Sequence, residues 1–396
     1  MRDFVTPQMF GAAADGVKDD TCAVRTAFEV AARENGVVRF PTGIYRVDEL
    51  DVPAQLSLEA APTWSYRRDG RAVLIPARAD QRYLLNVTNA VATTLMGLSL
   101  NGRKMGENLH GLYTDRGSRV EKDETSLRVD SCRCADFTGD GAHFEGIWAF
   151  SMRKSMFIGN KGYGCYLEGC DGFIVDCCFS ENNVGFGGDT WNSAVNFTSN
   201  RVEWNRECGV RLSGGMRYNL TGNYIDRSYG PAIVIEDAQN YHKRLHKYHT
   251  VVPYAITVTG NTIVRSGKAA VPDSDDDCHI RLRHAAGVTI TGNTFNIWKD
   301  DGRNGRISPN FGIIMDGCAD CVITANTFIP GAVKELIHDK GGHGGGMVIE
   351  RNAGHALPES AWNVQDPFTP VHFLMEGSVE WYRDILKGES NEEPER

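Results

Sequence analysis

Two acidic residues, Glu203 and Asp226, occupy the same place in a phrase that the chain repeats. The phrases read TSNRVEWN and TGNYIDRS, and in each the acid lies three positions after an asparagine, Asn200 or Asn223. Carboxylates held side by side repel each other, which raises one pKa and divides the pair into a protonated acid and an ionised base. General acid/base catalysis by Glu203 and Asp226 is therefore the first hypothesis.

Basic and aromatic residues follow this pair. The next position of the repeat carries Trp204, Arg227 and Arg265, which we expect to bind substrate. The alternative is a surface pair of acids steadied by the two arginines, since exposed acids are common and surface ion pairs stabilise little. Like charges that lie directly opposite each other on adjacent strands are destabilising, however. A solvent-exposed face without a function would not need such a pair.

The repeat that carries these residues has a period of about 22 or 23 residues. Each unit has three short runs of alternating apolar residues, which are typical of strands with one buried face. Asparagine suits the tight turn between two runs and can hydrogen-bond to its counterpart in the next unit. The equivalent turn positions are Ser155, Cys177, Asn200, Asn223, Asn261, Asn293, Asn326 and Asn352.

This pattern predicts an all-β fold, a right-handed parallel β-helix of about ten coils with three short strands per coil. Adjacent coils lie about 4.8 Å apart, so Glu203 and Asp226 are expected to be direct neighbours on one outer face. A β-sandwich with asparagine-rich turns would not explain a register that is held over so many units.

A second cluster is expected on the strand that opens each unit. Glu236 faces outward there and is the reserve catalytic candidate. Four further outward residues are expected to bind substrate: Arg211, His279, Arg281 and Arg283. Other polar outward positions of these strands are His143, Glu145, Tyr166, Glu168 and Asp316.

Insertions lengthen the coils beside this cluster, and long loops on a repetitive scaffold often determine specificity. His246, Asp300 and Asp301 are expected to contact substrate from such loops.

No metal or other cofactor is expected. His242, His246 and His249 would share one face of a helix and could bind a metal, but the neighbouring basic residues favour a solvated or anion-facing loop. The acidic run at 273–277 could bind calcium, although an exposed acidic loop is more common.

Composition narrows the class of protein. The chain has 396 residues, 41% hydrophobic, with 43 glycines and a net charge of −9, and no basic run interleaves with aromatics, so nucleic acid is not an expected partner. The sequence shows no signal peptide and no run long enough to span a membrane, so we expect a cytoplasmic protein without a membrane partner. The eleven cysteines are expected to be reduced and mostly buried.

The first 47 residues resemble the opening segment of the pectate-lyase-like β-helix superfamily. MFGAAADGVKDDTCAVRTAFEVAARENGVVRFPTGIYRV contains a Phe-Gly-Ala strand, an Asp-Gly turn, a helix capped by Asp20 or Thr21, and the phrase FPTGIYRV. The helix would close one end of the solenoid. Typical motifs of the polygalacturonases are incomplete here, because Asn293 and Thr294 are followed by Phe295, so their catalytic residues are not transferred.

This resemblance implies carbohydrate chemistry without naming the reaction. Relatives include polygalacturonases, pectate lyases, inulin fructotransferases, uronate epimerases and tailspikes, and in characterised relatives the first sheet commonly bears the active site. Three segments are expected: a cap at 1–47, coils at 48–354 with insertions at 237–253, 268–277, 298–309 and 330–345, and a C-terminal segment at 355–396 with a short helix and a disordered acidic tail.

We therefore expect a carbohydrate-active enzyme that cleaves or transfers a glycosidic bond of an oligo- or polysaccharide, in the manner of a glycoside hydrolase or an intramolecular fructosyltransferase. A first alternative is a polysaccharide lyase or epimerase in which Arg281, His279 or Arg227 removes the proton beside a uronic acid carboxylate. A second is a non-catalytic, tailspike-like β-helix that only binds carbohydrate. A homotrimer is also considered.

Overall fold

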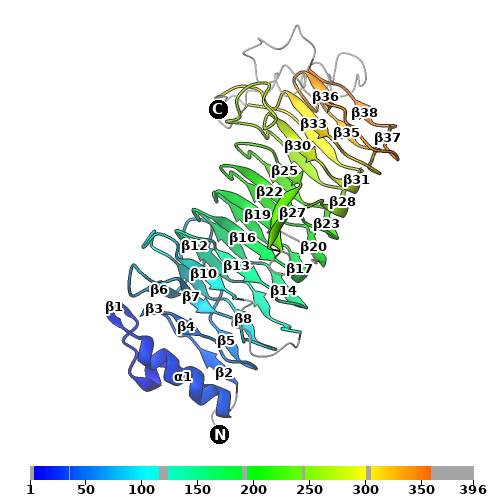
Figure 1. Ribbon diagram of the computed structural model, residues 1–396. Coiled ribbons are helices and arrows are strands. Elements are labelled where there is room, and N and C mark those ends of the chain that lie inside the picture. Colours follow the sequence, from blue (N-terminus) through cyan, green and yellow to red (C-terminus); the bar gives the residue numbers. More distant parts are fainter. Residues whose placement is uncertain are drawn as a thin grey trace, which may run out of the picture.

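The computed structural model describes residues 4–34, 36–115, 124–189, 194–242, 246–299 and 305–357. It is a long solenoid in which three parallel sheets run from one end to the other (Figure 1). We name the twelve-stranded sheet A, the thirteen-stranded sheet B and the eleven-stranded sheet C. No helix in these residues is long and apolar enough to cross a membrane.

The strands are short and recur in each coil. Sheet A contains β2 (Val37–Arg39), β5 (Ser57–Glu59), β8 (Thr94–Met96), β11 (Arg128–Asp130), β14 (Phe150–Arg153), β17 (Asp171–Val175), β20 (Ala194–Thr198), β23 (Tyr218–Thr221), β28 (Tyr254–Thr259), β31 (Ala286–Thr291), β34 (Val322–Thr324) and β37 (Val348–Glu350). Sheet B contains β1 (Asp15–Asp19), β3 (Gly43–Val47), β6 (Ala72–Pro76), β9 (Ser99–Asn101), β12 (Arg133–Ala135), β15 (Met156–Ile158), β18 (Cys178–Ser180), β21 (Arg201–Glu203), β24 (Tyr224–Asp226), β29 (Thr262–Val264), β32 (Thr294–Asn296), β35 (Thr327–Phe328) and β38 (Ala353–Gly354). Sheet C contains β4 (Leu50–Asp51), β7 (Tyr83–Asn86), β10 (His110–Tyr113), β13 (Ala142–Glu145), β16 (Tyr163–Glu168), β19 (Val184–Asp189), β22 (Cys208–Ser213), β25 (Ile233–Glu236), β30 (Cys278–Arg283), β33 (Phe311–Asp316) and β36 (Glu335–Asp339).

Each coil supplies one strand to sheets C, A and B in turn, as β22, β23 and β24 do. Alternating side chains point inward and stack on their counterparts in the next coil. The rings of Phe157 and Phe179 stack with centroids 5.2 Å apart, and those of Phe295 and Phe328 with centroids 4.7 Å apart. The predicted β-helix with three strands per coil is confirmed, because apolar alternation in every short run demands a shared interior.

The corner between sheets A and B is the predicted asparagine ladder. Buried side-chain amides donate to the side-chain oxygen of the next asparagine: Asn200 to Asn223 at 3.1 Å, Asn223 to Asn261, Asn261 to Asn293, Asn293 to Asn326, and Asn326 to Asn352, the last four at 2.9 Å. The predicted alignment of these asparagines is therefore confirmed, and with it the register of the coils.

Replacing Asn223 with alanine should lower the free energy of unfolding by about 3 kcal/mol or more. The Asn223 side chain donates to the Phe197 carbonyl and to Asn261, and it accepts from the backbone and side-chain N–H of Asn200, so its loss leaves several buried groups unpaired. Urea denaturation measures the change. Asn219→Ala, on the half-buried outer face of sheet A, is the control and should cost much less. Equal effects of the two replacements would contradict this account of the ladder.

A second corner, between sheets B and C, was not anticipated. Its first residue has a left-handed backbone in successive coils, with φ of 57° at Glu181, 59° at Trp204 and 55° at Arg227. Asn182 and Asn205 follow the first two, and the Asn182 amide donates to the Asn205 side-chain oxygen at 3.2 Å. The bend therefore recurs at the same place in three successive coils.

Glycines stand at the start of several strands of sheet C for a steric reason. A Cβ at Gly141 would lie 2.7 Å from the carbonyl oxygen of Gly164, and one at Gly209 would lie 2.6 Å from that of Ala232. Coils therefore approach most closely where each strand of sheet C begins, and a side chain at this position points toward the interior.

The N-terminal segment closes one end of the solenoid (Figure 1). The short helix η1 (Pro7–Phe10) precedes β1, and the amphipathic helix α1 (Thr21–Glu34) buries Ala23, Val24, Ala27, Phe28 and Ala31. The Asp19 carboxylate accepts from the Thr21 N–H, whereas Asp20 accepts from the backbone N–H groups of Ala13 and Ala14. The predicted cap is thus confirmed as an element, but Asp19, rather than Asp20 or Thr21, supplies the capping oxygen.

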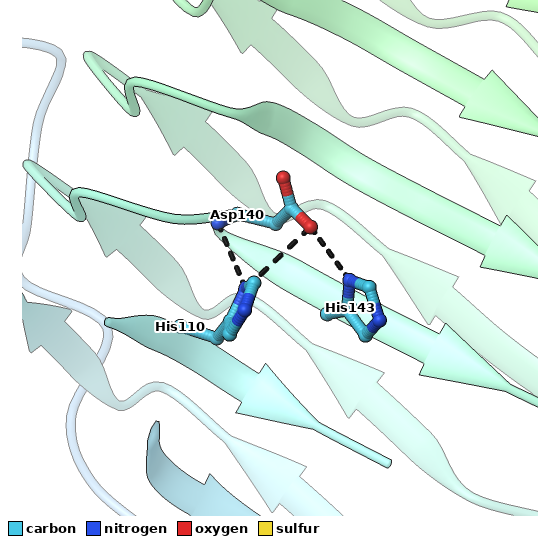
Figure 2. A group of neighbouring side chains, drawn as sticks. All are labelled: His110, Asp140 and His143. Atoms are coloured by element: carbon cyan, nitrogen blue, oxygen red, sulfur yellow. Dashed lines mark hydrogen bonds and ion pairs between the residues drawn. The ribbon is translucent and has the colours of Figure 1, made fainter. Parts of the chain in front are cut away.

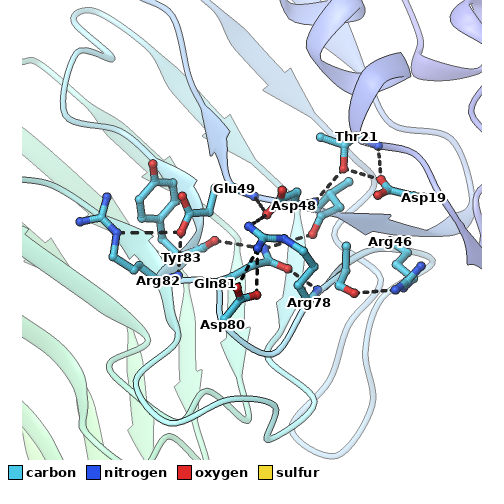
Figure 3. Close-up of polar contacts among 12 residues, drawn as sticks. Asp19, Thr21, Arg46, Asp48, Glu49, Arg78, Asp80, Gln81, Arg82 and Tyr83 are labelled. Atoms are coloured by element: carbon cyan, nitrogen blue, oxygen red, sulfur yellow. Dashed lines mark hydrogen bonds and ion pairs between the residues drawn. The ribbon is translucent and has the colours of Figure 1, made fainter.

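Polar contacts join this cap to the first coils (Figure 3). The Thr21 hydroxyl accepts from the Asp48 N–H at 2.8 Å, and Arg78 pairs with both Asp48 and Asp80. The cap is therefore bound to the neighbouring coils as well as packed against their apolar end.

One insertion has its own secondary structure. Strands β26 (Ala238–His242) and β27 (Lys247–Val251) form an antiparallel hairpin beside the solenoid (Figure 1). The predicted C-terminal helix and acidic tail lie outside the described residues, as does part of the 298–309 insertion. Of the eleven cysteines nine are buried, as predicted, and none is in a disulfide.

Candidate active site on the outer face of sheet C

Sheet C presents a row of aromatic, acidic and imidazole side chains on its outer face. In β13 the inward Ala142 and Phe144 alternate with the outward His143 and Glu145. Strand β16 follows the same pattern and turns Tyr166 and Glu168 outward. Backbone pairing places His143 opposite Tyr166 and Glu145 opposite Glu168, so the four side chains occupy two adjacent coils.

His143 is held by hydrogen bonds at both ring nitrogens. Its Nδ1 lies 2.7 Å from Asp140 Oδ2 (Figure 2). Its Nε2 lies 3.5 Å from Glu145 Oε1. Asp140 belongs to the turn before β13 and is itself fixed, because its Oδ1 accepts from the Tyr163 N–H at 2.6 Å and its own N–H donates to Nδ1 of His110 at 2.9 Å. A buried carboxylate thus orients an imidazole whose other nitrogen faces outward.

The two histidines of this group have opposite protonation behaviour. Burial opposes the charge of His143, but the hydrogen bonds to Asp140 and Glu145 outweigh it and raise its pKa to about 9. Burial lowers the pKa of His110 to about 4, and the charge of Asp140 offsets this only in part. At neutral pH His143 is therefore an imidazolium, a proton donor, and His110 is a neutral acceptor.

The same group contains enough ligand atoms for a metal ion, since one atom each of His110, Asp140 and His143 lies within 4.8 Å of the others. The Nδ1 atoms of both histidines, however, already take part in hydrogen bonds. Nδ1 of His110 accepts a backbone N–H, and Nδ1 of His143 donates to the carboxylate of Asp140. The arrangement fits a hydrogen-bonded proton relay better than a metal site, which needs free lone pairs.

Aromatic rings enclose the imidazolium. The ring of His143 stacks on Tyr113 at 5.6 Å and on Tyr166 at 4.9 Å, and Tyr83 stacks on Tyr113 at 5.2 Å. His143 remains 20% exposed at its side chain, and Glu145 is 32% exposed. The solvent-accessible face of sheet C therefore combines the hydrogen-bonded imidazolium of His143, the phenol groups of the tyrosines and the register pair Glu145–Glu168.

The predicted pair Glu203 and Asp226 is adjacent in the register, as expected, but its two members differ. Asp226 is fully buried and accepts from Arg227, from Nε of Arg265 at 2.9 Å and from the Tyr224 hydroxyl at 3.0 Å. The repulsion expected between two free carboxylates is thus offset by two arginines. Asp226 is not among the residues that line the cavity beside Glu203, and its contacts are with largely buried side chains of the coil corner.

Glu203 occupies a different environment. Its carboxylate pairs with Arg201 at 2.9 Å and lines an open cavity together with Trp204 and Arg227. The structure therefore brings Glu203, Trp204 and Arg227 together, as the sequence predicts. Arg265 instead forms an ion pair with the buried Asp226.

Glu236 lies in an arginine cluster further along sheet C. Its carboxylate is 3.0 Å from Arg281, 3.1 Å from Arg283 and 3.8 Å from Arg211, and Arg211 also pairs with Glu207 at 2.6 Å. The structure brings these four predicted residues together. The charge of the acid is thus opposed by three arginines, although the Nε groups of Arg211 and Arg281 are buried without a hydrogen-bond partner in the described part of the chain.

His279 was expected to face outward, and this expectation is wrong. The residue is fully buried, its ring lies 5.6 Å from that of Phe295, and burial lowers its pKa to about 3. It occupies the position that Gly209 and Ala232 hold in preceding coils, where side chains point inward. A substrate on the surface cannot reach it.

The other predicted loop residues do not contribute to the described site. His246 is exposed in the turn between β26 and β27. Asp300 and Asp301 lie outside the described residues, and so do the side-chain details of His242.

The alternation of the sequence places His143, Glu145, Tyr166 and Glu168 on this face without giving them a role, and it does not indicate His110, Tyr113 or Asp140. One signal was present: the segment GDGAHFEG combines an acid in a glycine turn with a histidine and a second acid at alternating positions.

Comparison with known proteins supports the architecture. The family model described as right-handed β-helix region matches residues 101–247 and 190–358. A capsule K30/K69-specific depolymerase of Klebsiella phage K64-1 is 24% identical over 306 residues, which cover 74% of this chain and 34% of that protein. The chain thus spans about a third of the length of this curated relative.

Solved structures with the same fold are diverse. The A-module of mannuronan C-5 epimerase AlgE4 from Azotobacter vinelandii has a TM-score of 0.57 at 16% identity, covering 89% of this chain and 99% of that one. DFA-IIIase from Arthrobacter chlorophenolicus A6 gives 0.63 at 11%, covering 90% and 100%, and the enzymatically active domain of bacteriophage CBA120 tailspike protein 2 gives 0.62 at 13%, covering 82% and 47%. At these identities the likeness concerns the fold, and it confirms the predicted right-handed parallel β-helix.

Proposed function

The chain belongs to the right-handed β-helix family, and from this premise we propose that it is a carbohydrate-active enzyme that cleaves a glycosidic bond of a polysaccharide on the outer face of sheet C. The observation that carries the proposal is the Asp140–His143 pair beside the register pair Glu145–Glu168. The relative named as a capsule depolymerase and the solved β-helices named as an epimerase and a DFA-IIIase support a carbohydrate substrate.

Hydrolysis is the reaction that these groups suit best. Nε2–H of the His143 imidazolium donates its proton to the glycosidic oxygen as the bond to the anomeric carbon breaks. A water molecule attacks that carbon, and the carboxylate of Glu168 or Glu145 accepts the proton that the water loses. Glu145 and Glu168 are register partners on adjacent coils, whose backbones are about 4.8 Å apart, so either carboxylate starts from the same face as the imidazolium.

Elimination is the second candidate reaction, and the charge of the face makes it less suitable. Asp140 and Glu145 hydrogen-bond to the His143 imidazolium, and Glu168 lies opposite Glu145 in the next coil, so the carboxylate of a uronic acid would meet acidic neighbours at the cleavage point. A neutral sugar unit at this position is more compatible with the site.

The test is a panel of neutral and acidic polysaccharides assayed for new reducing ends and for ultraviolet absorbance from unsaturated ends. We expect reducing ends without absorbance. Glu168→Gln should lower the kcat of that activity tenfold or more, because it removes one member of the carboxylate pair, whereas Glu203→Gln should leave kcat nearly unchanged. Absorbance would show elimination instead, and binding without either signal would show a non-catalytic carbohydrate-binding protein.

If Glu203→Gln abolishes turnover while Glu168→Gln does not, catalysis belongs to sheet B, as the repeated phrase first suggested.

The homotrimer considered from the sequence remains a prediction, which sedimentation equilibrium of the full chain would test.

A further inference from the structure

A second site lies at the corner between sheets B and C. It is a cavity of about 580 Å³ lined by Tyr66, Arg67, Glu181, Arg201, Glu203, Trp204, Arg206, Arg227 and Tyr229. Glu181, Trp204 and Arg227 are the left-handed residues of three successive coils, and all three line the cavity. Nothing in the proposed hydrolysis uses this place.

A loop from the first coils completes the cavity. Trp64 donates to the Ser131 carbonyl at 2.6 Å, Tyr66 hydrogen-bonds to Ser180, and Arg67 pairs with Glu181 at 2.9 Å. The loop between β5 and β6 therefore lies along the outer face of sheet B and reaches residues more than a hundred positions away in sequence. Such contacts hold one wall of the cavity in place.

The cavity is basic, although the chain as a whole has a net charge of −9. Four arginines and two glutamates line it. Arg67 and Arg201 each pair with one of the glutamates, and Arg227 pairs with the buried Asp226. Arg206 is exposed and has no acidic partner among the described residues, so its guanidinium is available to an anion.

Aromatic side chains add to this positive character. The Arg227 guanidinium lies 4.6 Å from the ring centroid of Trp204, and the Lys268 ammonium lies 4.4 Å from the same ring. Lys268 also lies 5.3 Å from the Tyr229 ring. Cation–π contacts thus hold two cations at the edge of the cavity.

We propose that this cavity binds a carboxylate-bearing sugar unit, a uronic acid, of an acidic polysaccharide. The Arg206 and Arg227 guanidinium groups would face the carboxylate, and the Glu181 and Glu203 carboxylates would accept from sugar hydroxyls. The inference rests on the proposed function only in taking the ligand to be a sugar. The site serves to hold the polymer, while sheet C carries the bond cleavage.

The experiment is isothermal titration of the full chain with an oligogalacturonate, its fully methyl-esterified counterpart and inorganic phosphate. We expect the acidic oligomer to bind, with an affinity that falls as salt rises, and the ester and phosphate to bind at least tenfold more weakly. Arg206→Ala should weaken binding about tenfold or more, as expected for loss of a charge-assisted hydrogen bond. Arg351→Ala removes an exposed arginine elsewhere and is the matched control.

Equal binding of the ester, equal binding of phosphate, or an unchanged affinity in Arg206→Ala would each overturn the proposal. Failure here and failure of the proposed hydrolysis are distinguishable. His143→Gln should keep the affinity for oligogalacturonate, and Arg206→Ala should keep the cleavage of any neutral polysaccharide that the enzyme accepts.

Discussion

Replacing His143 with glutamine should lower the rate of polysaccharide cleavage by more than a hundredfold, the range expected when a general acid is lost. The imidazolium is held by Asp140 at 2.7 Å and lies between the rings of Tyr113 and Tyr166. Glutamine retains hydrogen-bonding capacity but cannot transfer a proton at neutral pH. The measurement is kcat from the release of reducing ends.

The matched control is His338→Gln. His338 stands in the outer row of sheet C, where it pairs with Glu335, and it lies several coils away from the Asp140–His143 pair. Its replacement should leave kcat unchanged. If both variants are equally active, the imidazolium of His143 is not the acid.

The pH dependence of the wild-type enzyme follows from the same group. The pKa of about 9 lies above the usual 6.5, so activity that needs the imidazolium should persist through neutral pH and fall as pH rises through about 9. Stability has the same sign: the contribution of the charged His143 is complete below about pH 6.5 and is lost as pH rises through 9. Circular dichroism at the same pH values separates loss of the acid from unfolding.

Replacing Asp226 with asparagine should lower the free energy of unfolding by about 3 to 5 kcal/mol, the cost of breaking a buried ion pair. The carboxylate is fully buried and pairs with both Arg227 and Arg265. An amide carries no charge, so two largely buried guanidinium groups would lose their counter-ion. Urea denaturation measures the effect.

Asp130→Asn provides the control, since Asp130 pairs with the exposed Arg153 at 3.1 Å and surface pairs contribute less than about 1 kcal/mol. An Asp226→Asn variant that is as stable as the wild type would contradict the structural role and restore the idea of a strained carboxylate pair. Retention of kcat in the folded variant would separate the role of Asp226 in stability from any role in catalysis.

The sequence by itself determined the coil. Asn200, Asn223 and Asn261 could be aligned because each turns the chain and hydrogen-bonds to the next amide, and this requirement recurs from coil to coil at the corner between sheets A and B. Alternation then fixed which residues face outward, including Glu203 and His143. These properties are local and repeated, so a single chain reveals them.

The tertiary structure decided how the outward side chains are used. Arg265 is separated from Asp226 by an insertion, and Tyr66 reaches Ser180 from the first coils, so neither contact has a fixed sequence spacing. His279 lies near the start of β30, where it and the next residue, Ile280, are both buried. Strict alternation would have turned His279 outward, so its burial could not be read from the sequence pattern.

The same reason explains the candidate site. A β-helix places residues of successive coils side by side, but the protonation of His143 depends on Asp140, which comes from a turn and which His110 of the preceding coil also contacts. Periodicity specifies the face on which a side chain stands. Burial and the partners that insertions and turns bring near it determine whether that side chain becomes an acid, a buried ion pair or part of an anion-binding cavity.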